Sequence, residues 1–335
     1  MFIKKKSVPF ITICIPVFQS EKYLSRCLKS VFSQNYQNFE VIVVNDASNG
    51  IDDYGNNFQK IIKKAEKKFH KKIKTFNHEK NKGLLEARRT AVYAAKGEYI
   101  CVLDSDDFLE PDALLSLSEI AKKSNADIIH GKANLFFENN EDKVSDDKQE
   151  MMTIKEKVVN HIFDGKLQNN QIFDGFLLSH NHCGFLWAKL IKKEIYIEAL
   201  NKIPSIHCTM NEDFLQYFFI SYFAKSYCGF NKKVYDYSIS SGISSRAEIN
   251  TLERWEKICS TSSIFTFLLD EIQNENPQNY SEAHSNAIKM ECIKKLKNNL
   301  LQFKTVVAPV IQKEAYQMLC DYWGEDFVKK IETSQ

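Results

Sequence analysis

The sequence lacks the features that mark several common classes of protein. Its 45 Lys and Arg residues are nearly balanced by 43 Asp and Glu residues, which leaves a formal net charge of +2. This small surplus argues against nucleic acid binding through bulk electrostatics. The nine cysteines include no CxxC pair and no Cys/His cluster with zinc spacing. We therefore expect a reduced, cytoplasmic protein whose thiols mostly fill the core.

Long hydrophobic runs and glycine-rich phosphate loops are missing as well. No segment reaches the ~18–20 apolar residues that span a bilayer, so any membrane contact is expected to be peripheral. The opening stretch MFIKKKSVPFITICIPVF mimics a signal peptide, but it contains Pro9 and Pro16 and no small-residue cleavage site. We interpret it as a short tail followed by a core strand. Neither GxGxxG nor GxxxxGK[ST] occurs where a Rossmann cofactor site or a P-loop would need it.

Apolar strand-like runs alternate with amphipathic helical patterns over about the first 130 residues, which is typical of a parallel α/β sheet. Ser20 is predicted to cap the first helix, Gly97 to end a later helix, and Pro111 to open the next one. The strands are predicted at residues 10–18, 39–46, 72–79 (an edge strand), 98–103 and 126–131.

The pattern loosens after residue 131. Residues 136–150, FFENNEDKVSDDKQE, are charged and lack apolar periodicity, so a loop is predicted there. Helical periodicity returns near the C-terminus, at residues 252–272, 283–303 and 312–323. We therefore expect a helical region at the end of the chain.

Polar and aromatic side chains follow the predicted strands where ligands bind in open α/β sheets, at the carboxyl ends. Phe18 follows the first strand, Asp46 ends the second, and Asp104 and Asp106 stand in the stretch GEYICVLDSDDFLEPD. An aromatic ring beside a lone acid suits a nucleobase, and the acid cluster suits Mg²⁺ or Mn²⁺ bridging to phosphates. Arg88, on a predicted helix, is placed to pair with phosphate or with an aspartate. A helix N-terminus or a turn is the alternative explanation for these acids.

Several segments in this order resemble family 2 glycosyltransferases with the GT-A fold, of the type that builds bacterial surface glycans. They are ITICIPVFQSEKYLSRCLKSVFSQNYQNFEVIVVNDAS, NKGLLEARRTAVYAAKGEYICVLDSDDFLEPD, WAKLIKKE and NEDFLQYFF. The similarity is dense over residues 8–130 and sparser beyond them. It implies an α/β GT-A fold: a mostly parallel nucleotide-binding sheet flanked by helices, followed by a C-terminal helical subdomain.

The resemblance also implies a division of the chain. Residues 1–240 would form the glycosyltransferase domain, with a nucleotide-sugar-binding half at 1–130 and an acceptor-binding half at 131–240. Residues 241–335 would form the helical C-terminal region.

The resemblance implies a role for each matching position. Asp106, together with Asp104, would bind Mn²⁺ or Mg²⁺ against the diphosphate. Asp213 in NEDF would be the general base, and Glu212 beside it would support the acceptor pocket. Trp187 would either stack on an acceptor sugar or pack in the core. The donor side would comprise Pro16, Phe18, Asp46, Asn81, Arg88, Asp104 and Ser105.

The implied reaction is a single in-line displacement that inverts the sugar carbon, because one base and no protein nucleophile are indicated. The enzyme would be of the hexosyltransferase type. The donor would be a nucleoside diphosphate sugar, most simply a UDP-sugar. The acceptor would be a glycan or lipid-linked glycan, such as lipooligosaccharide or capsule, reached from the cytoplasmic side with peripheral contact to the inner membrane.

Two alternatives and one departure from the family pattern remain open. A sugar-nucleotide nucleotidyltransferase would open with a Gly-rich, Arg-bearing loop, whereas this chain has PVFQSEKY. A catalytically silent nucleotide-sugar-binding protein would not need Asp104, Asp106 and Asp213 together. The departure is Ser238, which stands where relatives often carry an arginine, and Arg246 or a nearby serine is the candidate replacement.

Overall fold

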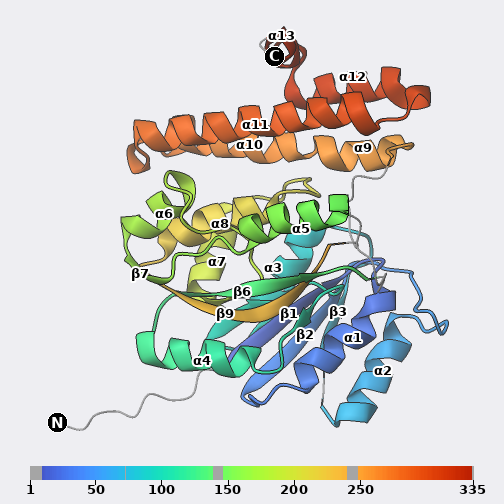
Figure 1. The fold of residues 1–335 in the computed structure, drawn as a ribbon, viewed down its shortest axis with the longest axis vertical. Helices are drawn as coiled ribbons and strands as arrows, with labels where there is room; N and C mark the ends of the chain where they lie inside the picture. The colour runs from blue at the N-terminus through green and yellow to red at the C-terminus, as the bar shows by residue number, and fades with distance from the viewer. Residues whose placement is uncertain (1–9, 72, 139–145, 240–247, 334–335) are drawn as a thin grey trace.

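The computed structural model describes residues 10–71, 73–138, 146–239 and 248–333. Figure 1 shows a central sheet with helices on both faces and a further layer of C-terminal helices stacked on one of these faces. The N-terminal tail that the sequence analysis separated from the first strand lies outside the described residues.

One mixed sheet of nine strands organises the described chain, in the order β3-β2-β1-β4-β8-β6-β9-β5, with β7 paired to β9. Strands β1 to β4 run parallel to one another, whereas β8 is antiparallel to both β4 and β6. The strands are β1 (Ile11–Val17), β2 (Phe39–Asn45), β3 (Lys74–Asn77), β4 (Tyr99–Val102), β5 (Phe108–Leu109), β6 (Ile128–Phe136), β7 (Gly165–Gln168), β8 (Lys189–Lys192) and β9 (Ser226–Ser238).

Helices α1, α2 and α4 cover one face of the sheet, while α3, α6, α7 and α8 cover the other (Figure 1). The α-helices are α1 (Glu21–Phe32), α2 (Phe58–Phe69), α3 (Leu84–Ala94), α4 (Ala113–Ser124), α5 (Asp146–Val159), α6 (Asn170–Leu177), α7 (Lys193–Lys202), α8 (Glu212–Phe223), α9 (Leu252–Cys259), α10 (Thr261–Asp270), α11 (Glu282–Val306), α12 (Gln312–Trp323) and α13 (Glu325–Thr333). A π-helical turn (Glu271–Glu275) and two 3₁₀ turns (Pro277–Asn279 and Pro309–Ile311) interrupt the C-terminal helices.

The five predicted strands are confirmed as β1, β2, β3, β4 and β6, and β3 lies at the edge of the sheet as expected. Both sheet faces are covered, so β1 is buried along its whole length. This burial explains why its sequence is a nearly continuous apolar run.

Two of the three predicted helix boundaries are wrong, whereas Ser20 is the N-cap residue of α1 as predicted. Helix α3 ends at Ala94, and Gly97 is instead needed by packing, since a Cβ there would lie 2.5 Å from the backbone nitrogen of Thr12. The side chain of Ser20 makes no cap bond, because its Oγ lies 2.6 Å from Ser105 Oγ. Pro111 precedes the helix α4, which begins at Ala113 after the N-cap residue Asp112.

The predicted loop at residues 136–150 is also only partly right. Residues 139–145 lie outside the described part of the chain, but α5 begins at Asp146 inside the stretch. The predicted helix at 252–272 is divided at Ser260 into α9 and α10. Local periodicity could not show that division, because Ser260 is fully buried and bonded to a neighbouring loop.

The C-terminal helices share a hydrophobic core with the sheet. One cluster of buried side chains contains Val44 of β2, Leu215 of α8, Phe265 of α10, Leu296 of α11 and Leu319 of α12. A boundary at residue 240 stays a prediction, and in the described chain these helices share one buried cluster with α8. None of the described helices is long and apolar enough to cross a membrane.

Candidate active site

Arg88 lies at the centre of the site, where its guanidinium contacts carboxylates from two other segments of the chain. It lies on α3 and is 1% exposed. Its Nη2 donates to Asp104 Oδ1 at 3.0 Å, just beyond β4, and its Nη1 donates to Asp213 Oδ1 at the start of α8. Glu212 Oε1 lies 3.9 Å from Nη1. The structure therefore brings together four of the predicted site residues from three distant segments.

A single guanidinium faces three acids in this cluster. Burial alone would lower the pKa of Arg88, but the charges of Asp213, Asp104 and Glu212 hold that pKa above its ordinary value. Burial raises the pKa of Asp104 to about 6 against the opposing charge of Arg88. Burial and the charge of Asp213 raise the pKa of Glu212 to about 7. Among the described residues, no hydrogen-bond partner reaches Glu212 Oε2. The site is thus short of positive charge.

The raised pKa of Glu212 predicts a pH effect on stability. The folded protein holds this proton more tightly than the unfolded chain, whose ordinary value is 4.5. The stability gained from protonated Glu212 is therefore fully present below about pH 4.5 and is lost as pH rises through about 7. We expect the melting temperature to fall more between about pH 5 and about pH 8 in the wild type than in Glu212→Gln. Parallel profiles in a thermal melt would contradict this assignment.

The acids after β4 divide into two kinds. Asp107 is buried and structural, since it accepts from Tyr235 Oη and from the Ser238 backbone N–H, both at 2.7 Å. Asp106 is only half-buried, and within the described residues no hydrogen bond or ion pair occupies its carboxylate. The carboxylate of Asp106 is therefore available to a ligand.

Asp104 and Asp106 fit a cation that is shared with a substrate. Carboxylate oxygens are the donors that Mg²⁺ and Mn²⁺ prefer, and Mg²⁺ commonly uses one or two carboxylates together with phosphates and water. No group of three or more His, Cys, Asp or Glu side chains gathers for a metal in the part of the chain that the structure describes. The excess of negative charge around Arg88 also favours a further cation. Asp104 and Asp106 therefore suit a cation that a diphosphate would also bind. They do not suit a metal site in which the protein supplies every ligand.

On the donor side, Asp46 is tied into the fold. It is 2% exposed, with His78 Nδ1 lying 2.6 Å from its Oδ1. The backbone N–H groups of Lys82 and Gly83 donate to its two oxygens at 2.9 and 2.8 Å. Asp46 therefore holds the turn that carries Asn81 to the start of α3. Contact with a nucleobase stays a prediction, and the sequence analysis missed His78 because nothing in its local pattern marks it.

The other donor-side positions differ in access. Phe18 is 45% exposed just after β1, and Asn81 is exposed in the turn before α3. Pro16 is buried within β1, and Ser105 is buried against Ser20. Only the first two can offer side-chain area to a nucleotide without rearrangement.

On the acceptor side, Trp187 is packed in the core. It is 3% exposed and stacks on Phe185, Tyr235 and Tyr237, with ring centroids at 4.8, 5.0 and 5.2 Å. Of the two roles that the sequence left open, this packing supports the structural one.

Arg26 of α1 is a basic residue that the sequence analysis missed near these acids. Its guanidinium donates to both oxygens of Glu138 and to the carbonyl of Asp106, at 2.6–2.9 Å. Ser238 Oγ donates to the same Glu138 at 3.2 Å. The candidate Arg246 lies outside the described residues. Ser238, which stands where relatives often carry an arginine, is thus linked through Glu138 to the guanidinium of Arg26 on α1.

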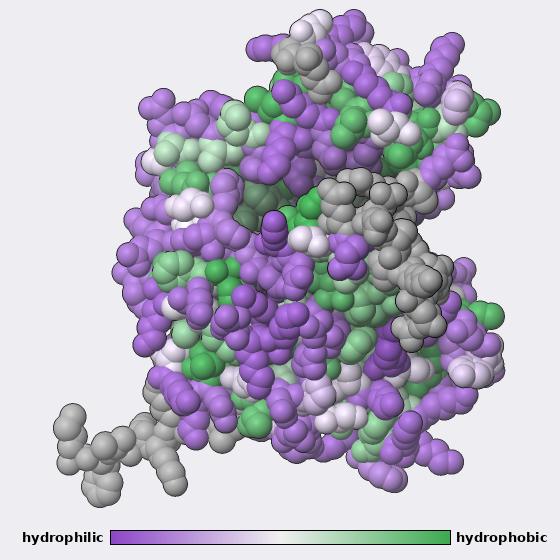
Figure 2. Space-filling view, viewed as in Figure 1, coloured by the Kyte–Doolittle hydropathy of each residue, from purple (hydrophilic) through white to green (hydrophobic). Residues whose placement is uncertain are grey.

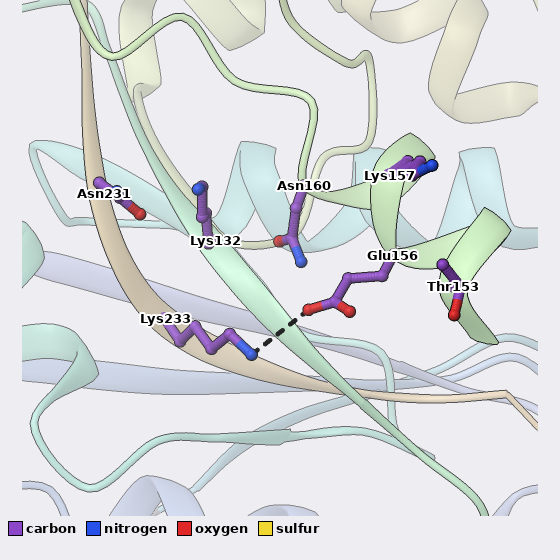
Figure 3. A pocket seen from close by; sticks show the side chains of 7 residues that line it. All are labelled: Lys132, Thr153, Glu156, Lys157, Asn160, Asn231 and Lys233. Carbon is purple, nitrogen blue, oxygen red and sulfur yellow. Dashed lines mark ion pairs between the residues drawn. The ribbon is translucent and has the colours of Figure 1, made fainter. Parts of the chain in front are cut away.

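A separate pocket lies between α5, β6 and β9. Its volume is about 340 Å³, and Figure 3 shows Glu156 reaching toward Lys233, with their charged atoms 3.5 Å apart. The lining residues are Lys132, Thr153, Glu156, Lys157, Asn160, Asn231 and Lys233. None of the predicted site residues lines it, so the pocket is distinct from the carboxylate cluster.

Two solved structures share the fold of this chain. S. aureus TarS 1–349 in complex with UDP matches with a TM-score of 0.51 at 16% identity, covering 97% of this chain and 92% of that one. The mannosyltransferase PcManGT from Pyrobaculum calidifontis, in complex with GDP-Man and Mn²⁺, matches with a TM-score of 0.54 at 12% identity, covering 97% and 82%. These likenesses define the fold of this chain as the GT-A fold.

The chain belongs to glycosyl transferase family 2, whose model matches residues 12–194. Glycosyltransferase GlyG of Streptococcus pneumoniae serotype 4 is 27% identical over 191 residues, which are 56% of this chain and 58% of GlyG. Chondroitin synthase of Escherichia coli is 40% identical over 118 residues, which are 35% of this chain and 16% of the synthase. The chain thus spans less than two thirds of either relative.

Proposed function

We propose that this protein transfers a sugar from a UDP-sugar to a hydroxyl of a growing surface glycan, with inversion at the sugar carbon. One observation carries the proposal: Asp104, Glu212 and Asp213 converge on buried Arg88. Nearby Asp106 has a carboxylate that makes no hydrogen bond or ion pair within the described residues. The UDP bound to TarS and the GDP-Man and Mn²⁺ bound to PcManGT support a nucleotide-sugar donor and a metal at this fold.

The donor would lie across the carboxyl ends of β1, β2 and β4. Exposed Phe18 would stack on the base, Asp46 would border it, and Asn81 would line the same edge. Asp106 and Asp104 would hold Mn²⁺ or Mg²⁺. When bound, this cation supplies a Lewis acid that neutralises the departing diphosphate.

The acceptor hydroxyl would approach Asp213. Its Oδ1 accepts a hydrogen bond from Arg88, which orients the carboxylate and leaves Oδ2 to take the hydroxyl proton. The acceptor oxygen then bonds to the anomeric carbon as the bond from that carbon to the diphosphate oxygen breaks. The electron pair leaves with the nucleoside diphosphate. One displacement inverts the configuration, and no protein nucleophile takes part.

The acceptor class and the cellular setting belong to the same proposal. A polysaccharide acceptor is supported by relatives such as the chondroitin synthase of Escherichia coli. We place the reaction on the cytoplasmic side, at a lipid-linked glycan, with residues 1–240 catalytic and 241–335 as the helical region.

Replacing Asp106 with asparagine is expected to abolish metal-dependent UDP binding. A ligand that binds only the native state raises the melting temperature, so UDP with Mn²⁺ should stabilise the wild type more than either alone. The joint shift should disappear in Asp106→Asn and persist in Asp112→Asn, a matched control from the same stretch. An unchanged joint shift in Asp106→Asn would contradict the metal assignment, and stabilisation by a nucleoside triphosphate alone would favour a nucleotidyltransferase.

A panel of UDP-sugars would then identify the donor. We expect Mn²⁺-dependent release of UDP from one or a few of them. Release that proceeds equally well in excess EDTA would contradict metal-dependent transfer.

A further inference from the structure

Asn211, directly before the catalytic carboxylates, has an unexpected conformation. Asparagine is a preferred N-cap residue, in which an extended backbone lets the side chain accept from the first turn of the helix. At the start of α8, however, Asn211 has φ 64° and ψ 15° and makes no side-chain cap bond. Left-handed backbone is uncommon outside glycine, although asparagine adopts it more readily than most other residues. The local preferences of asparagine therefore do not by themselves decide how α8 begins.

The side chain of Asn211 is held by the C-terminal helices. Its Oδ1 accepts a hydrogen bond from Lys295 Nζ of α11 at 2.7 Å, and its Nδ2 donates to Thr261 Oγ1 of α10 at 3.3 Å. Both polar ends of the amide are thus occupied by residues that lie at least 50 positions further along the chain. In Figure 1, α10 and α11 lie in the layer next to α8.

The loop before Asn211 is attached to the same helices. Thr209 Oγ1 donates to the carbonyl of Lys257 at 3.0 Å and lies 3.1 Å from Ser260 Oγ, which also accepts from the Thr209 N–H at 3.2 Å. Phe214, one residue after Asp213, packs against Phe265 of α10 with ring centroids 5.9 Å apart. Contacts with α9, α10 and α11 therefore flank the two carboxylates on both sides.

The C-terminal helices and the sheet half are partly separated on the surface drawn in Figure 2. The face in view is largely hydrophilic and is hollowed between the C-terminal helices and the sheet half, where hydrophobic atoms are visible in the recess. The contacts between the start of α8 and the helices α9, α10 and α11 can hold α8 only while those helices stay packed against it.

We propose that Lys295 and Asn211 are positioning residues, which hold the first turn of α8 so that Asp213 stays aligned with Arg88 and with the acceptor. This inference rests on the proposed role of Asp213 as the base. Without the Lys295 bond, Asn211 is free to take the N-cap conformation that asparagine prefers, and Glu212 and Asp213 then turn with the backbone. The C-terminal helices are in this way part of the active site's support.

The test compares Lys295→Met with Lys297→Met, an exposed lysine on the same helix. Lys295→Met should lower kcat for release of UDP from a hydrolysed UDP-sugar by roughly 10- to 100-fold, since small misplacements of reacting groups have effects of this size. The KM for the donor should be unchanged. Lys295→Arg, which keeps a donor, should recover part of the rate. Adding Asn211→Ala to Lys295→Met should cause little further loss, because both remove one interaction.

Equal kcat for Lys295→Met and Lys297→Met would overturn the proposal, as would a loss confined to KM or fully additive effects in the double variant. Hydrogen exchange distinguishes failure of the positioning role of Lys295 and Asn211 from failure of the proposed function. If the wild type releases no UDP from any donor, the proposed function fails. Faster exchange at residues 206–216 in Lys295→Met alone would still support the anchor. Unchanged exchange there would overturn it.

Discussion

Replacing Arg88 with methionine is expected to destabilise the protein by about 3–5 kcal/mol, the usual cost of removing one partner from a buried ion pair. Arg88 is 1% exposed and bonded to Asp104 and Asp213, so its loss leaves acids facing one another with no cation. Transfer should be lost as well, because Asp213 loses its orientation. Urea unfolding at about pH 8 measures the stability, and UDP release measures transfer.

The pH dependence of this loss distinguishes charge from packing. The pKa values of Asp104, about 6, and of Glu212, about 7, are already raised. Removing Arg88 raises them further, so both acids are protonated at about pH 5 and the penalty should shrink there. Arg89→Met is the control, because Arg89 bonds to Glu86 and to backbone carbonyls at the edge of the site. Equal destabilisation by the two variants would contradict a central role for Arg88.

Replacing Asp213 with asparagine is expected to lower kcat by about 10²- to 10⁴-fold, which is the usual contribution of a general base. Asparagine keeps an oxygen that can accept from Arg88 Nη1, so the fold and the joint stabilisation by UDP and Mn²⁺ should persist. Transfer to a glycan acceptor, or UDP release in its absence, gives the rate.

The matched control for this variant is Glu212→Gln, its neighbour in the same turn of α8. Because Glu212 lies 3.9 Å from Arg88 and makes no close bond to it, the rate should fall much less than in Asp213→Asn. A near-normal rate in Asp213→Asn would show that another group removes the acceptor proton.

The sheet half of the fold could be predicted well from sequence. Strands β1 and β2 are buried on both faces, so nearly every position must be apolar and the pattern is unmistakable. Helix α5 was missed because its segment is charged and lacks a wide apolar face. Gly97 was misassigned because the contact that requires glycine comes from Thr12, on a strand distant in sequence.

The candidate site could be predicted in part. The acids at strand ends were visible because the carboxyl ends of parallel strands meet at one edge. Their partners were not visible. His78 holds Asp46, Glu138 holds Arg26, and Lys295 holds Asn211, and each pair joins residues far apart in the chain. Burial of Trp187 between aromatic rings was equally beyond local pattern.

By itself, the sequence determined the family, the alternation of strands and helices, and which acids stand at strand ends, because periodicity and motif order are local properties. Only the tertiary structure decided that Arg88 sits among three acids, that Asp46 is committed to a turn, and that α10 and α11 hold the start of α8. Charge compensation and hydrogen bonding between distant segments depend on distances of a few ångströms. Such distances arise only when the chain packs.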